Sequence, residues 1–220
     1  MKRPSRTECV ETIRTLGVIA VVRLDDPAQL AAVVDALAAG DVRAIEVTMT
    51  MPRAIEALSA LAPTRSERLV IGAGSVLDAE TARVAILGGA RFIVAPTFDA
   101  GVLAMCHRYD VVAIPGAYTP TEILTATTAG ADLVKLFPAS TLGPGYLREL
   151  KGPLPHVRLV PTGGVTAESA GAFVEAGAVA VGVGGALVPR DAVARGDWSR
   201  LTESARRLTA VVRSARERTR

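Results

Sequence analysis

Short apolar, β-branched runs alternate with alanine-rich stretches along this chain, and the alternation repeats eight times. Each run is bounded by turn residues and is too short for a helix, which is typical of buried parallel strands. The alanine-rich stretches between them carry helix start and stop signals. The expected strands are residues 18–23, 44–48, 69–72, 92–95, 111–115, 133–137, 158–161 and 178–183.

Capping residues mark the helices between these strands. Asp26 precedes a proline at the first helical position, and Gly40 ends that helix. Asp78 and Thr119 open later helices in the same way. Eight strand–helix units in 220 residues predict an α/β fold, a (β/α)8 TIM barrel formed by residues 1–220 as one domain. An extra helix over Arg6–Leu16 is expected to cover the barrel bottom.

A doubly wound open sheet is the alternative architecture for alternating strands and helices. That fold needs a glycine-rich phosphate loop after its first strand. The first expected strand is followed instead by Arg23-Leu24-Asp25-Asp26, which contains no glycine. The barrel is therefore the favoured interpretation.

Composition excludes several classes of protein. The two cysteines, Cys9 and Cys106, form no C-x-x-C motif or disulfide framework, which favours a reducing cytoplasm. We expect no signal peptide, because the apolar stretch after the basic start is short, and no membrane span. His107 and His156 lie away from the strand ends, and neither metal-ligand spacing nor a nucleotide motif is present, so no metal or cofactor is expected.

Much of the net positive charge, +3, lies near the C-terminus. We interpret this segment as a solvated terminal helix and not as a nucleic-acid site, because no aromatic residues interleave with the charges. The arginines concerned are Arg206, Arg207, Arg213, Arg216, Arg218 and Arg220.

Lys135 is an exceptional residue because it lies inside the apolar strand 133–137. The chain contains 25 Lys and Arg residues, of which only Lys2, Lys135 and Lys151 are lysines. Lysine is rarely buried without a reason, and arginine cannot replace it where a neutral amine is needed. A desolvated lysine amine can attack carbonyl groups. The alternative is a lysine that extends its amine from the strand end to water.

Function in a TIM barrel collects at the C-terminal ends of the strands. Glu46 and Thr48 share one face of the second strand, and Glu46 and Lys135 can both point into the barrel. This pair combines an amine nucleophile with a carboxylate proton shuttle, although a salt bridge between Glu46 and Lys135 or Arg23 is the structural alternative. Arg23 and Ser75, at two further strand ends, can hold a carboxylate.

Two glycine pairs end the seventh and eighth strands. Gly163 and Gly164 follow Thr162, while Gly184 and Gly185 follow the last strand. These two loops are the usual phosphate site of TIM barrels, because glycine lets backbone N–H groups approach an anion closely. Plain turn geometry is the alternative explanation for either pair alone. Together they predict an anion site.

These residues resemble the bacterial class I 2-keto-3-deoxy-6-phosphogluconate (KDPG) aldolases, which are grouped with 4-hydroxy-2-oxoglutarate (KHG) aldolases. The resemblance spans nearly the whole barrel, in order. The matching motifs are Ile45-Glu46-Val47-Thr48, Gly72-Ala73-Gly74-Ser75-Val76, Phe92-Ile93-Val94-Ala95-Pro96, Pro115-Gly116, Thr119-Pro120-Thr121-Glu122, Lys135-Leu136-Phe137-Pro138 and Pro161-Thr162-Gly163-Gly164-Val165.

The resemblance implies a Schiff-base aldolase in which Lys135 is the nucleophile and Glu46 the general acid and base. It also implies that the enzyme is a metal-free homotrimer that binds pyruvate and a phosphorylated 2-keto acid, not nucleic acid or a membrane. The implied pyruvate contacts are Arg23, Ser75, Pro96 and Phe137. The implied phosphate contacts are Thr162, Gly163, Gly164 and the loop after the eighth strand.

Three positions depart from the usual family pattern: Ser75 replaces threonine, Gly185 replaces a phosphate-binding serine, and Thr50 replaces an arginine of one branch. The last two bear on substrate preference, so 4-hydroxy-2-oxoglutarate and the galactonate epimer are alternative substrates. Two alternatives of another class are an epimerase-like barrel that binds a phosphorylated ligand without covalent catalysis, and a non-catalytic trimeric scaffold.

Overall fold

The computed structural model describes residues 4–65 and 69–219, and Lys2, Arg3 and Arg220 lie outside them. Within these residues all eight expected strand regions are present, and the fifth is split in two. The strands are β1 (Val18–Val22), β2 (Ala44–Thr48), β3 (Val70–Gly74), β4 (Phe92–Val94), β5 (Val112–Ile114), β6 (Gly116–Ala117), β7 (Val134–Leu136), β8 (Leu159–Pro161) and β9 (Val181–Val183).

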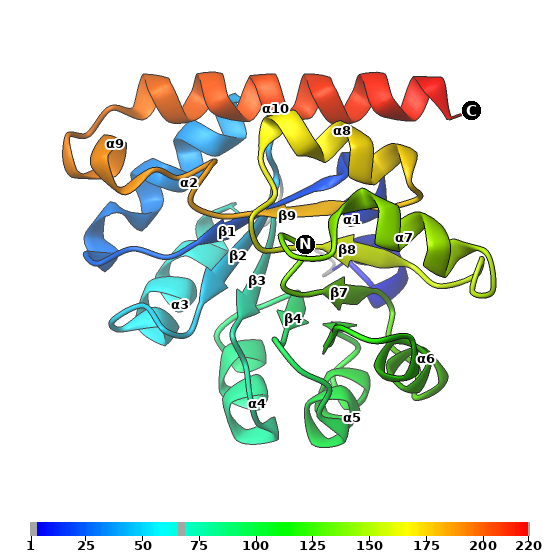
Figure 1. Cartoon of the computed structure of the whole chain (residues 1–220). Helices are drawn as coiled ribbons and strands as arrows, with labels where there is room; N and C mark the ends of the chain where they lie inside the picture. The colour runs from blue at the N-terminus through cyan, green and yellow to red at the C-terminus, as the bar shows by residue number, and fades with distance from the viewer. Residues whose placement is uncertain (1–3, 66–68, 220) are drawn as a thin grey trace.

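Helices follow the strands and surround them (Figure 1). The helices are α1 (Arg6–Leu16), the 3-10 helix η1 (Pro27–Gln29), α2 (Leu30–Ala39), α3 (Ala54–Arg65), α4 (Ala79–Leu87), α5 (Ala100–Arg108), α6 (Pro120–Thr128), α7 (Gly143–Lys151), α8 (Ala167–Glu175), α9 (Arg190–Ala194) and α10 (Trp198–Arg218).

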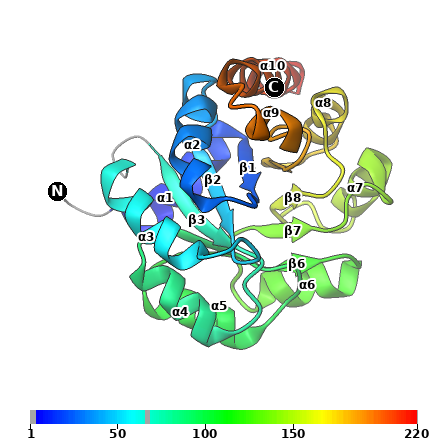
Figure 2. The same ribbon diagram turned by 90° about the vertical axis from the view of Figure 1, so that its left-hand side faces the viewer.

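The strands close into a parallel barrel, which confirms the predicted TIM-barrel fold (Figure 2). One sheet has the order β5-β4-β3-β2-β1-β9 and the other the order β6-β7-β8. Pro115, which has no N–H to donate, separates β5 from β6. The chain continues directly from one to the other, and a bridge between Thr162 and Gly182 joins β8 to β9. These two links complete the ring.

The lower half of the barrel is filled by apolar side chains and closed by α1. Phe92 is fully buried inside, and a Cβ atom on Gly72 of the neighbouring strand would lie 2.4 Å from its ring. Cys9, Val10 and Ile13 on one face of α1 pack into the same interior cluster. The prediction that Arg6–Leu16 forms a helix covering the barrel bottom is therefore confirmed.

The expected C-terminal helix is α10, and most of its arginines are exposed to solvent as expected. The opposite, apolar face of the helix is buried, and α10 packs along α2 and α8 (Figure 1). Two of its arginines form ion pairs with α8: Arg207 with Glu168 and Arg218 with Glu175, each at 2.7 Å. These contacts fix α10 across the helices that precede and follow it in the ring.

Arg216 ties α10 to the start of the chain. Its guanidinium donates hydrogen bonds to the carbonyl oxygens of Arg14, Thr15 and Val179. A Cβ atom on Gly17 would lie 2.6 Å from the same guanidinium, so the close approach requires glycine there. Helix α10 therefore helps to hold α1 in its place at the barrel bottom.

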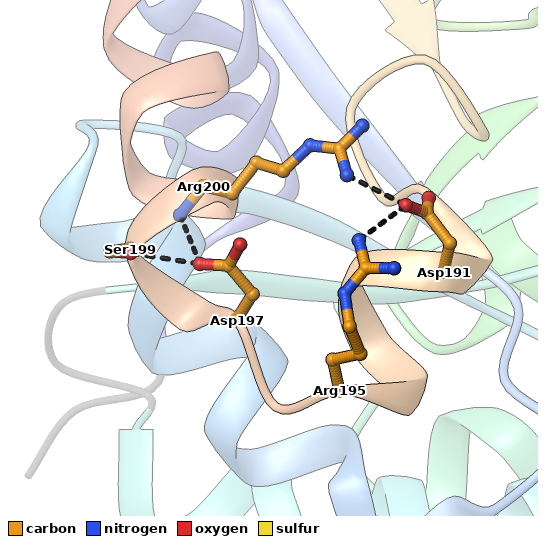
Figure 3. Close-up of polar contacts among 5 residues, drawn as sticks. All are labelled: Asp191, Arg195, Asp197, Ser199 and Arg200. Carbon is orange, nitrogen blue, oxygen red and sulfur yellow. Dashed lines mark hydrogen bonds and ion pairs between the residues drawn. The ribbon is translucent and has the colours of Figure 1, made fainter.

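The corner between α9 and α10 is held by a small polar network (Figure 3). Asp191 accepts from Arg195 at 2.6 Å and from Arg200 at 2.7 Å. Asp197 caps α10 by accepting from the Arg200 backbone N–H and from the Ser199 hydroxyl. Hydrogen bonding to these donors lowers the pKa of both carboxyl groups, so the network stays ionised at neutral pH.

Candidate active site

Four polar or charged side chains are buried among the described residues: Glu46, Thr48, Lys135 and Thr162. All four were expected at the site: Thr48 is the last residue of β2, Thr162 directly follows β8, and Glu46 and Lys135 are the central residues of β2 and β7. The lower part of the barrel interior is apolar. The barrel therefore has an apolar base and a polar upper layer, as an active site at the C-terminal face requires.

Glu46 lies on β2 between Val21 of β1 and Gly72 of β3, and its side chain is 2% exposed. Its Oε1 atom is buried and has no hydrogen-bond partner within the described chain. Desolvation raises the pKa of this carboxyl group, and the positive charges of Lys135 and Arg23 oppose that rise. No ion pair with either cation is present among the described residues, so the salt-bridge alternative does not describe this geometry.

Lys135 lies on β7 and is 5% exposed. Its Nζ atom is 4.7 Å from the centre of the Phe137 ring and has no hydrogen-bond partner among the described residues. Lys151, by contrast, donates from Nζ to the carbonyl oxygens of Pro155 and Val157 and serves the fold. Of the two lysines in the part of the chain that the structure describes, the one on β7 therefore keeps its amine available for chemistry.

The remaining expected residues of the keto-acid pocket lie at neighbouring strand ends. Arg23 follows β1 and is exposed, and Pro96 follows β4. Ser75 directly follows β3 and adopts a left-handed backbone conformation with φ of 59°. The Thr48 hydroxyl donates to the carbonyl oxygen of Val22 on the neighbouring strand at 3.2 Å.

The loops after β8 and β9 contain the expected glycines. Gly163 and Gly164 have φ values of 89° and 75°, which favour glycine. The hydroxyl of Thr162 donates to a carbonyl oxygen within the barrel wall, so the turn offers backbone groups instead. A Cβ atom on Gly185 would meet nothing within 4 Å. A turn starts at Gly184, whose carbonyl oxygen accepts from the N–H groups of Leu187 and Val188, and the short helix α9 begins at Arg190.

The sequence prediction missed the clearance that Gly74 gives to Glu46. A Cβ atom on Gly74 would lie 1.8 Å from Oε1 of Glu46, so the carboxyl group occupies the space of the missing side chain. Gly74 pairs with Thr48 in the strand register, two positions after Gly72, which is the register partner of Glu46. The sequence feature that could have predicted this space is a glycine at an inward-facing position of the strand next to Glu46.

The described residues include no group of three or more His, Cys, Asp or Glu side chains placed to hold a metal ion. None of the helices formed by residues 4–65 and 69–219 is both long and apolar enough to cross a membrane.

A parallel (β/α)8 barrel with an inward lysine beside a buried carboxylic acid defines the class of the class I aldolases, which form a Schiff base. The family model described as KDPG and KHG aldolase matches residues 9–204. The chain belongs to this family.

Two curated relatives and one solved structure illustrate the similarity. The 2-dehydro-3-deoxy-phosphogluconate aldolase of Treponema pallidum (strain Nichols) is 35% identical over 206 residues, 93% of this chain and 96% of the relative. The 2-dehydro-3-deoxy-6-phosphogalactonate aldolase of Escherichia coli (strain K12) is 32% identical over 173 residues, 78% and 84% of the two chains. The KDPG aldolase of Legionella pneumophila, solved with pyruvate captured as a covalent carbinolamine, has a TM-score of 0.86 and 28% identity, covering 92% of this chain and 98% of that one.

Proposed function

We propose that this protein cleaves 2-keto-3-deoxy-6-phosphogluconate to pyruvate and glyceraldehyde 3-phosphate. Lys135 is the Schiff-base nucleophile and Glu46 the general acid and base. The observation that carries the proposal is the burial of both groups in one barrel, where Oε1 of Glu46 has no hydrogen-bond partner among the described residues and the charge of Lys135 acts on this carboxyl group. Burying ionisable groups lowers the free energy of unfolding, so such groups are found mainly where catalysis needs them.

The first half of the reaction builds an electron sink. The unprotonated amine of Lys135 attacks the C2 carbonyl of the keto acid and gives a carbinolamine. Glu46 supplies the proton that lets the C2 hydroxyl leave as water, and an iminium remains. The raised pKa of Glu46 suits this step, because the carboxyl group can hold a proton closer to neutral pH than an exposed glutamate can.

The second half breaks the carbon chain. Glu46, now ionised, accepts the proton of the C4 hydroxyl, directly or through a water molecule. The C3–C4 bond breaks, its electron pair moves into the iminium to form an enamine, and C4 becomes the aldehyde carbon of glyceraldehyde 3-phosphate. Protonation of the enamine at C3 and hydrolysis of the iminium then release pyruvate and restore Lys135.

Two sets of residues at the barrel mouth hold the two ends of the substrate. Arg23 and Ser75 hold the keto-acid carboxylate, while Pro96 and Phe137 form the apolar wall of the pyruvate pocket. The phosphate binds at the turns after β8 and β9, where Gly163, Gly164, Gly184 and Gly185 offer backbone N–H groups. The distal phosphate and the reacting carbonyl are thereby held at the same time.

Two other substrates fit the same chemistry, namely 4-hydroxy-2-oxoglutarate and the galactonate epimer of the phosphorylated keto acid. Gly185 has no hydroxyl to offer a phosphate, and the exposed Thr50 has no charge. Comparison of kcat/KM for the three substrates decides among them. A preference for 4-hydroxy-2-oxoglutarate would overturn the assignment of a phosphorylated substrate and leave the Schiff-base mechanism intact.

We also propose that the protein is a homotrimer. Leu77, Val84 and Leu87 are large apolar residues exposed on α4 and the loop before it, and we propose that they contribute to the contact between subunits. Light scattering during size-exclusion chromatography measures the mass. Leu87→Asp is expected to shift the protein toward monomer, and a wild-type protein that elutes as a monomer would contradict the proposal.

Reductive trapping tests the proposed chemistry. Incubation with pyruvate and borohydride should add one pyruvate-derived group, and peptide mapping should place it on Lys135. Lys135→Arg should give no adduct and no turnover, because the guanidinium does not lose its proton. Labelling of Lys2 or Lys151 instead would contradict the assignment. The absence of any adduct in wild-type protein would favour a non-catalytic binding barrel or scaffold.

A further inference from the structure

The segment after β7 leans directly on the glycine turn after β8. A Cβ atom on Gly164 would lie 2.5 Å from Cβ and 3.3 Å from Oγ of Ser140. A Cβ atom on Gly163 would lie 3.0 Å from the ring of Phe137. Only glycine allows these two approaches, so Ser140 lies against the turn that we propose as the phosphate site.

Hydrogen-bond donors remain unused at this turn. Within residues 4–65 and 69–219, neither the Ser140 hydroxyl nor the backbone N–H groups of Gly163, Gly164 and Gly185 donate a hydrogen bond. Ser140, Gly164 and Gly185 are exposed to solvent. Polar donors at a mouth that have no protein partner are free to serve a ligand that accepts hydrogen bonds.

Hydrogen bonds on both sides of Ser140 hold it in place. The Thr141 hydroxyl donates a hydrogen bond to the carbonyl oxygen of Pro138. The Tyr118 hydroxyl therefore donates to the Thr141 hydroxyl oxygen, at 3.2 Å. On the other side, the N–H of Ala139 donates to the carbonyl oxygen of Thr162 at 2.8 Å. The serine is thus presented from a segment anchored to two neighbouring strands, so little order has to be gained when a ligand binds.

We propose that Ser140 is a specificity-determining residue whose hydroxyl donates a hydrogen bond to the phosphate of the substrate. It supplies, from the loop after β7, the hydroxyl that Gly185 lacks in the loop after β9. This inference rests on the proposed phosphorylated substrate. A phosphate oxygen accepts strongly from a hydroxyl, whereas a substrate that ends in a carboxylate nearer the reacting carbon does not reach the same turn.

Ser140→Ala tests the inference by removing the hydroxyl alone. The measured quantity is the ratio of kcat/KM for 2-keto-3-deoxy-6-phosphogluconate to that for 4-hydroxy-2-oxoglutarate. We expect this ratio to fall about tenfold, mainly through KM, as for the loss of one hydrogen bond to a charged group. Inhibition by inorganic phosphate should weaken by a similar factor. The double variant Ser140→Ala, Gly185→Ser should recover part of the ratio, because a hydroxyl returns from the other loop.

Ser59→Ala is the matched control, because Ser59 is an exposed serine on α3 that lies beside Gly88 at the C-terminal end of α4. It should leave the ratio unchanged. An unchanged ratio in Ser140→Ala, with wild-type enzyme active on the phosphorylated substrate, would overturn the role of Ser140 alone. Wild-type enzyme that neither cleaves that substrate nor is inhibited by inorganic phosphate would overturn the proposed substrate and, with it, this inference.

Discussion

Gly74→Ala is expected to displace the Glu46 carboxyl group, the proposed proton shuttle, while leaving Glu46 itself unchanged. The new Cβ atom would lie 1.8 Å from Oε1, 2.4 Å from Cδ and 2.5 Å from Cγ of Glu46. Real Cβ atoms do not approach other heavy atoms within 3.0 Å, so something must move. The strand backbone is fixed by its ladder on both sides, and the carboxyl group is the part that can rotate away.

The size of the displacement sets the size of the effect. Restoring a contact of 3.0 Å from 1.8 Å requires a shift of 3.0 − 1.8 = 1.2 Å at Oε1. Misplacing a reacting group by about 1 Å costs on the order of 10²-fold in rate. This corresponds to about 2.7 kcal/mol of transition-state stabilisation. We therefore expect kcat/KM of Gly74→Ala to fall about 10²-fold, with the loss mainly in kcat.

Steady-state cleavage coupled to pyruvate detection provides the assay, and thermal unfolding checks that the barrel remains folded. Gly145→Ala is the control, because a Cβ atom there meets nothing within 4 Å and its backbone needs no positive φ. It should behave as wild type in both measurements. A folded Gly74→Ala variant with kcat/KM within about threefold of wild type would refute the argument that Gly74 sets the position of Glu46.

Four further outcomes are expected. Glu46→Gln should slow cleavage by about 10²–10⁴-fold, and activity within a factor of a few would make Glu46 merely structural. The same variant should unfold at a higher temperature than wild type at neutral pH. Because the folded-state pKa of Glu46 is raised, wild-type protein loses folding stability as pH rises above the ordinary glutamate pKa, whereas the neutral amide does not. The difference in unfolding temperature between the two proteins should vanish below about pH 4, where Glu46 is protonated in both the folded and the unfolded state. Gly185→Ser has room for its side chain and should lower KM for the phosphorylated keto acid more than for 4-hydroxy-2-oxoglutarate; equal effects would show that this loop does not read the phosphate. Activity should persist in EDTA, because the iminium on Lys135 supplies the electron sink, and a loss restored by a divalent ion would point to a metal-dependent reaction.

Much of the fold was predictable from the sequence because local signals agreed with one another. The helix over Arg6–Leu16 has the predicted bounds, with a Ser5–Glu8 capping box at its start and Gly17 in a left-handed conformation at its end. Asp78 caps α4 as expected. The split of the fifth strand was less visible, because only the observed pairing shows that Pro115 interrupts the ladder without ending the strand region.

The sequence predicted which residues form the site, but not the close contacts between them that glycine permits. The burial of Lys135 and Glu46 follows from strand periodicity and the position of strand ends. The contact of Ser140 with Gly164 depends on how far two loops lean toward each other, which no local pattern encodes. The arginines of α10 are exposed charges as expected, but their ion pairs were not visible in the sequence because partners such as Glu168 are distant along the chain.

The contacts of Arg216 imply that the two ends of the chain come together last when the barrel folds. Its hydrogen bond to Thr15 joins residues 201 positions apart, and β1 also pairs with β9. A ribosome makes the first helix early, yet Arg216, which helps to hold this helix in its place, is made only about 200 residues later. Closing so long a loop is entropically costly and slow. The nascent chain should therefore keep an open-ended, protease-sensitive barrel until Arg216 has left the exit tunnel, and final locking should be a post-translational event.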